Sequence, residues 1–145
     1  MNNKLKLVLF AITPFIIGNL FNLIALSGIS ALFLIFSILF CVYWLWVGFI
    51  SYKLTDSKVQ SLLIGNSFGI VTIIVLLVMR LVFQSYLPGF IGFQLQMYFL
   101  PATGVASRIL TILFKSVSMI GVFGASFVLM VLIYYVGFIV SRKRN

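Results

Sequence analysis

The sequence predicts an all-α integral membrane protein: a four-transmembrane-helix bundle with an outer re-entrant or interfacial segment and an amphipathic helix between spans 3 and 4. Two observations predict this class. The 145 residues are 63% hydrophobic and only 8% charged, whereas a soluble domain typically has about 25% charged residues. The apolar residues also gather into four runs of roughly 20 residues, the length of helix that crosses a bilayer. We therefore expect a single membrane domain covering residues 1–145.

The first two spans are predicted at residues 5–26 and 30–51. The first run is longer than the apolar core of a secretory signal peptide, which has about 7–15 residues, so we expect it to remain as a membrane helix. Only residues 27–29 join the two spans, which predicts a tight antiparallel hairpin. Pro14 lies inside span 1, where it is expected to kink or end the helix because it lacks a backbone N–H.

The third and fourth spans are predicted at residues 61–83 and 117–140, and both carry small residues at helical spacing. These are Ser61, Gly65 and Gly69 in the third span, and Gly121 and Ala125 in the fourth. Small residues on one helical face let another backbone approach closely. They indicate either packing within the bundle or a docking face for a second copy or a partner protein.

The orientation follows from the basic residues. With the N-terminus inside, seven of them lie on the inner side and three on the outer side. The inner ones are Lys4, Lys6, Lys53, Lys58, Arg142, Lys143 and Arg144, and the outer ones are Arg80, Arg108 and Lys115. The positive-inside rule then places both termini in the cytoplasm. The Ile-, Phe-, Asn- and Lys-rich composition favours a bacterial plasma membrane.

Two further groups of side chains are predicted at the membrane surfaces. Aromatic residues close spans 2 and 4 near the inner interface: Tyr43, Trp44, Trp46, Tyr52, Tyr134 and Tyr135. Such residues form belts at headgroup level. The candidate lipid headgroup contacts are Arg108, Lys115, Arg142, Lys143 and Arg144, because basic side chains beside a span attract anionic lipids.

The outer segment, residues 84–116, divides into two halves. Between Phe93 and Phe99 apolar and polar residues alternate, with Gln94 and Gln96 on the polar side, and this period of two favours extended or irregular backbone. An apolar stretch of 10–14 residues is typical of a re-entrant or interfacial segment, and residues 87–101 fit either. From about Ala102 a helical pattern predicts an amphipathic helix.

Polar side chains inside the spans are candidate sites, because they are costly in lipid. Asn19 and Asn22 share a face near the outer end of span 1, and Arg80 lies near the outer end of span 3, where it can meet Asn22. Arg80 either reaches outward to lipid headgroups or recognises an anion or a partner. The candidate interaction or pore residues are Arg80, Asn19, Asn22, Gln94 and Gln96.

The composition also excludes several kinds of chemistry. The sequence has no histidine and no glutamate. Its one acidic side chain is Asp56, and its one thiol is Cys41. Protein metal sites need several His, Cys or carboxylate ligands, and general acid–base catalysis needs a base held by an orienting group. We therefore expect no metal, no cofactor and no enzymatic activity. Nucleic acid is not expected either, because the basic residues lie at span ends rather than on one face.

Two classes of function are compatible with these features. The first is a non-catalytic protein that acts by protein–protein interaction, either as an accessory subunit of a membrane transport or secretion complex or as an immunity-type protein. The second is a small channel, holin-like pore or facilitator formed by an oligomer. The expected partners are the lipid bilayer and either another membrane protein or further copies of the chain. The first class is favoured because ion and solute pathways usually need more polar lining than these spans supply.

Overall fold

The computed structural model describes residues 2–26, 30–55, 57–83, 90–114 and 116–144. Their regular structure is entirely α-helical, which confirms the predicted all-α class. The helices are α1 (Asn3–Leu26), α2 (Ser30–Leu54), α3 (Lys58–Gly65), α4 (Ser67–Phe83), α5 (Phe90–Leu113) and α6 (Met119–Arg144).

Three of these helices are long and apolar enough to cross a membrane on their own: α1, α2 and α6. Helices α3 and α4 pass the same test only together, as a pair bent by 55°. The chain is therefore compatible with a multi-pass membrane protein of three spans, or of four if the bent pair is one span. The predicted hairpin at residues 27–29 lies outside the described residues.

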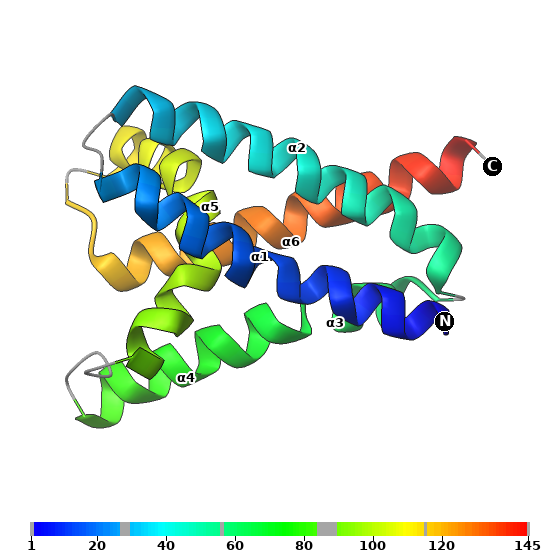
Figure 1. The fold of residues 1–145 in the computed structure, drawn as a ribbon, viewed down its shortest axis with the longest axis horizontal. Coiled ribbons are helices and arrows are strands. Elements are labelled where there is room, and N and C mark those ends of the chain that lie inside the picture. Colours follow the sequence, from blue (N-terminus) through cyan, green and yellow to red (C-terminus); the bar gives the residue numbers. More distant parts are fainter. Residues whose placement is uncertain (1, 27–29, 56, 84–89, 115, 145) are drawn as a thin grey trace.

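The long helices run lengthwise and α5 lies across them (Figure 1). Helix α1 begins and α6 ends at the same end of the bundle, which we call the terminal end. At the opposite end, which we call the hairpin end, α1 and α4 finish and α2 and α6 start. Both ends of α5 lie near the hairpin end (Figure 1). Helix α5 thus fills the bundle near the hairpin end without running its length.

Helices α2 and α6 cross with their backbones in close contact. A Cβ atom added at Gly48 would lie 2.1 Å from the carbonyl oxygen of Tyr134, and one at Gly137 would lie 2.1 Å from the carbonyl oxygen of Leu45. Real Cβ atoms essentially never approach another atom so closely. Glycine is therefore the residue that permits this crossing, as small residues do in other membrane bundles.

The centre of the bundle is filled by aromatic side chains. Trp44, Tyr98, Phe99 and Tyr134 are fully buried, and Trp44 lies against Tyr134 with ring centroids 6.0 Å apart. The prediction that Trp44 and Tyr134 lie in an interfacial belt is therefore wrong. Their rings fill the space between α2 and α6, because apolar burial in the core competes with the interface for large aromatic side chains.

The structure also corrects the predicted outer segment. Extended backbone over its first half is wrong, because α5 is one helix from Phe90 to Leu113 that continues through a buried Pro101. The alternating pattern misleads because α5 contacts α1, α2 and α6 and so buries residues on several faces. Glycines again mark the crossings. A Cβ at Gly18 would collide with the backbone of Met97, and one at Gly104 would lie 2.8 Å from the Cβ of Ser37.

Two further expectations about the spans are corrected. The third span is not one continuous helix, since it breaks at Asn66, whose side-chain Nδ2 donates to the Leu62 carbonyl oxygen at 3.1 Å. Beside it, the Ser67 hydroxyl donates to the Ile64 carbonyl oxygen at 2.8 Å. Such local bonds satisfy backbone groups where a helix is interrupted. In span 1, α1 continues through a buried Pro14 rather than ending there.

Candidate functional site

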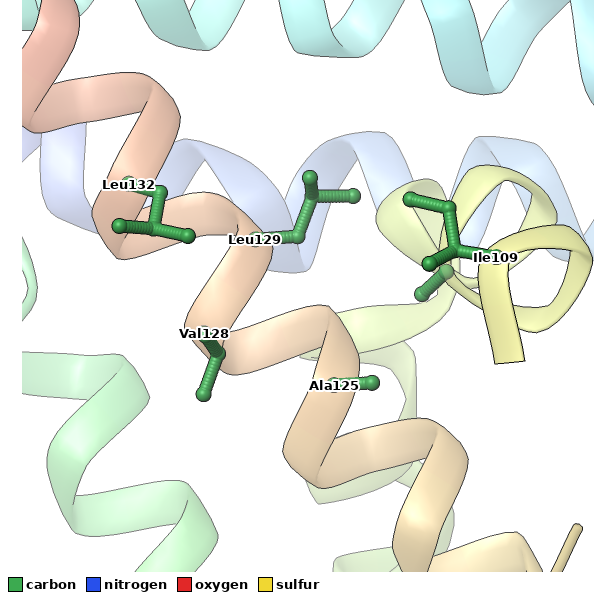
Figure 2. A pocket seen from close by; sticks show the side chains of 6 residues that line it. Ile109, Ala125, Val128, Leu129 and Leu132 are labelled. Carbon is green, nitrogen blue, oxygen red and sulfur yellow. The ribbon is translucent and has the colours of Figure 1, made fainter. Parts of the chain in front are cut away.

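An apolar groove lies between α5 and α6. It has a volume of about 260 Å³, and it is lined by Ala106 and Ile109 of α5 and by Ala125, Val128, Leu129 and Leu132 of α6. The four α6 residues lie along one stretch of that helix, and Ile109 of α5 lies across from Leu129 and Ala125 (Figure 2). We call this hollow the α5–α6 groove. Its lining consists of aliphatic side chains.

Two glycines beside the groove differ from those at the helix crossings. A Cβ added at Gly124 would meet nothing within 4 Å, and one at Gly121 would meet only side chains of residues 117 and 118, just before it. By contrast, Cβ atoms at Gly48 and Gly137 would collide with the neighbouring backbone. Within the described part of the chain, an added Cβ at either glycine in the first half of α6 therefore meets no other helix.

Exposed apolar residues lie at the end of α5 and at the start of α6. Ile112 is 84% exposed, and Leu113, Phe114 and Met119 are also exposed. Arg108 is exposed next to Ile109 on the same helix. The predicted headgroup contact Lys115 lies outside the described residues. Apolar surface of this kind, with a cation beside it, suits either lipid or a partner protein in the membrane.

A second hollow lies at the terminal end and is polar. It has a volume of about 300 Å³ and is lined by Tyr52, Thr55, Lys58, Phe138 and Arg142. Phe138 is buried, whereas Lys58 and Arg142 are exposed. The hollow therefore has a closed base and a cationic rim. Of the other predicted headgroup contacts, Lys143 is exposed beside Arg142, and Arg144 is the last residue of α6.

A third hollow, of about 280 Å³, lies between α5 and the start of α6. Its lining is Gln96, Met97, Leu100, Thr103, Met119, Val122 and Phe123. The neighbouring glutamine, Gln94, is used differently. It exchanges two hydrogen bonds with Asn19 of α1: Asn19 Nδ2 donates to Gln94 Oε1 at 3.1 Å, and Gln94 Nε2 donates to Asn19 Oδ1 at 3.3 Å. The polar groups of Asn19 and Gln94 thus join α1 to α5.

The remaining predicted polar residues lie on α1 and α4. Among the described interactions, the amide partner of Asn19 is Gln94 and not Arg80. Asn22 is half-buried on α1, and Arg80 is exposed near the end of α4. The predicted meeting of Asn22 with Arg80 stays a prediction.

The predicted small-residue face of span 3 contacts α6 through aromatic side chains. A Cβ at Gly65 would lie 2.3 Å from the Tyr134 hydroxyl oxygen, and one at Gly69 would lie 3.1 Å from the rings of Phe127 and Tyr98. Ser61 is fully buried, and its hydroxyl lies 3.0 Å from that of Tyr134. A Cβ at Gly121 would instead meet side chains of residues 117 and 118.

Sequence reasoning missed a buried polar cluster near the terminal end. The Tyr134 hydroxyl donates to the Ser61 carbonyl oxygen at 3.0 Å, and the Ser61 hydroxyl donates to Ser51 Oγ at 2.9 Å. Ser51 in turn donates to the Gly48 carbonyl oxygen. This cluster ties α2, α3 and α6 together. Hydroxyls spread over three separate runs gave no sequence signal of their proximity.

Metal-ligating side chains do not form a cluster in the part of the chain that the structure describes. No group of three or more His, Cys, Asp or Glu side chains gathers there. Comparison with protein-family models, with curated proteins and with solved structures finds no match to this chain. The function is therefore inferred from the grooves, charges and contacts of the chain itself.

Proposed function

We propose that this chain is a non-catalytic multi-pass protein of the bacterial plasma membrane that binds a transmembrane helix of another protein. It would act as an accessory subunit of a transport or secretion complex, or as an immunity-type protein. The observation that carries the proposal is the α5–α6 groove, together with the unused small residues of α6 beside it. In lipid, helices associate through close packing at small residues rather than through the hydrophobic effect.

The shape of the groove fits one helix. The lining residues Ala125, Val128, Leu129 and Leu132 of α6 are spaced as one helical face. The surface of α6 is also low at Gly121 and Gly124, because neither residue has a side chain that would keep the backbone of another helix away. An aliphatic helix laid along α6 would bury this face and the neighbouring Ile109. A helix-in-groove contact of this type is a common recognition mode.

A foreign helix suits the rim of the groove better than a second copy does. Arg108 is exposed at the rim, and Lys115 follows in sequence, so a second copy packed there would bring further cations. It would bring no balancing carboxylate, because Asp56 is the sole acidic side chain of the sequence. Like charges placed together disfavour a partner. The expected partner is therefore an apolar helix flanked by acidic residues at the end that meets Arg108.

The membrane placement that goes with this function has four crossings and both termini in the cytoplasm. Helices α1, α2 and α6 would each cross once, and the bent α3–α4 pair would make the fourth crossing. Helix α5 would be re-entrant. It meets Gly18 of α1, eight residues before Leu26, which corresponds to about 12 Å of helix below the hairpin end.

A pore is the alternative, and the filled interior counts against one within a single chain. The centre of the bundle holds the buried rings of Trp44, Tyr98, Phe99 and Tyr134, and α5 lies across the hairpin end (Figure 1). A pore could still form between several copies of the chain in an oligomer. The hollow between α5 and α6 that Gln96 lines would be one entrance to it.

The test is co-purification from the native membrane in a mild detergent, followed by mass spectrometry. A stoichiometric foreign membrane protein is the expected result. Ala125→Phe fills the groove and should abolish the co-purification, whereas Val71→Phe on the exposed side of α4 should not affect it. A pure homo-oligomer that makes liposomes leaky would refute the proposal and establish the pore.

A further inference from the structure

We infer that the polar hollow at the terminal end is a binding site for a phosphate group. The site is built from three elements: Tyr52 and Thr55 at the end of α2, Lys58 at the start of α3, and Phe138 and Arg142 in the last turns of α6. This inference does not depend on the proposed partner. We call the hollow the phosphate site.

The two cationic side chains of the site belong to two different chemical types, and both types bind phosphate groups in proteins. A guanidinium presents several N–H donors in a flat fork that matches two phosphate oxygens, whereas an ammonium acts as a compact point charge. Arg142 and Lys58 supply one of each on opposite elements, α6 and α3. An anion held between them would also join the two helices.

Lys58 is held in place by an aromatic side chain. Its Nζ donates to the Tyr135 hydroxyl oxygen at 2.6 Å and lies 4.4 Å from the centre of the Tyr135 ring. The ammonium group has three protons, so two stay available for an anion. A charge that is already positioned loses less conformational freedom on binding than a free lysine does.

The base of the site is closed and rigid. Phe138 is only 3% exposed, and its ring lies edge-to-face against that of Tyr52, with centroids 5.6 Å apart. The Thr55 hydroxyl donates to the Ser51 carbonyl oxygen at 2.9 Å, so Thr55 serves as wall rather than as donor. The volume of about 300 Å³ is at the lower limit of small-molecule sites, which is about 300 Å³.

The charge balance around the site favours an anion. The basic residues at this end of α2, α3 and α6 include Lys53, Lys58, Arg142 and Lys143, and Arg144 is the last residue of α6. Asp56, which lies outside the described residues, is the sole acidic side chain of the sequence. The site also lies where the apolar stretches of α2 and α6 finish, at Leu54 and Lys143. Lipid phosphates and soluble phosphates both reach that level.

Binding is measured on the full-length protein in detergent by native mass spectrometry. The two probes are phosphatidylglycerol and inorganic phosphate, each added alone and then together. The test variant is Lys58→Gln with Arg142→Gln. The matched control is Lys53→Gln with Lys143→Gln, which removes the same charge from the same end but from outside the lining. Arg142→Gln alone, at an exposed position, replaces the test variant if the double variant unfolds.

The expected result is one saturable phosphatidylglycerol or one phosphate per chain. The test variant should bind it about tenfold more weakly, as the loss of charge-assisted hydrogen bonds predicts, and the control should match the wild type. Displacement of the lipid by inorganic phosphate would assign the site to soluble phosphates, and resistance to displacement would assign it to headgroups. Equal weakening in test and control variants, or no saturable binding of either probe, would overturn the inference.

Discussion

Glycine has two different roles in this chain, and the contacts of each position distinguish them. At Gly18, Gly48 and Gly137 the missing side chain lets the backbone of a second helix come close. At Gly124 nothing occupies the space where a side chain would lie. The first role stabilises the fold, and the second leaves a surface open. Both roles were hidden in the sequence, because glycine inside an apolar run looks the same in either case.

Gly48→Ala is expected to destabilise the protein and Gly124→Ala is not. The new Cβ at residue 48 would meet the Tyr134 carbonyl oxygen at 2.1 Å, and relieving such overpacking costs about 1–3 kcal/mol. At residue 124 the methyl group has room, and alanine favours the helix. Reversible unfolding in mixed detergent micelles measures both. Equal stability of the two variants would show that α2 and α6 are not in backbone contact.

Tyr134→Phe is expected to reduce the free energy of unfolding by about 1–3 kcal/mol, the cost of leaving buried polar groups without their partner. The hydroxyl that it removes bonds to both the carbonyl and the hydroxyl oxygens of Ser61. Tyr135→Phe is the control, because the Tyr135 hydroxyl bonds to the exposed Lys58. The same unfolding measurement should show a change within about 0.5 kcal/mol there. A larger effect at Tyr135 than at Tyr134 would contradict the assigned network.

At the scale of the elements, the sequence predicted α1, α2 and α6 well and the first half of α5 poorly. The long apolar runs predicted α1, α2 and α6, because a span must be continuous and apolar. Helix α5 has no single apolar face, since it contacts α1, α2 and α6. Its alternating stretch around Gln94 and Gln96 therefore suggested extended backbone. Contacts from several directions, rather than local preference, determine its conformation.

A double-mutant cycle on Asn19 and Gln94 tests how α5 is attached to α1. Each single leucine substitution leaves one amide without its partner, so each should destabilise the protein, whereas the double substitution should cost less than the sum. We expect a coupling energy of about 0.6 kcal/mol, as for other polar pairs between membrane helices. Asn22→Leu with Gln94→Leu is the control cycle. Full additivity in the first cycle would mean that the Asn19–Gln94 pair does not hold α5.

At the scale of the whole molecule, the helix directions make a testable statement about topology. Helix α1 begins and α6 ends at the terminal end, and α5 stays near the hairpin end (Figure 1). Reporter domains fused to the N-terminus and the C-terminus should therefore both report the cytoplasm. A reporter inserted within residues 84–89 should report the outside. Opposite locations of the two termini would show an odd number of crossings and would exclude the four-crossing arrangement.

The sequence predicted much less of the candidate sites than of the fold. Ala125 was predicted to be a small packing residue and a helix was predicted from about Ala102, but the sequence did not show that Ala106 and Ile109 of that helix line a groove with Ala125. Arg142 was recognised as a headgroup contact, but Lys58 and Tyr52 lie far from it in sequence. Sites formed between helices depend on how the helices cross. The sequence indicates which residues share one face of a helix, but it does not indicate which helix faces contact one another.

The most direct test of the central claim is photocrosslinking in the native membrane. A photoreactive amino acid replaces Val128, which is 55% exposed in the α5–α6 groove, or Leu81, which is 77% exposed on α4. The proposed function predicts one discrete adduct with a foreign membrane protein from residue 128 and none from residue 81. An adduct from residue 128 with a second copy of the chain, or identical adducts from both positions, would contradict it.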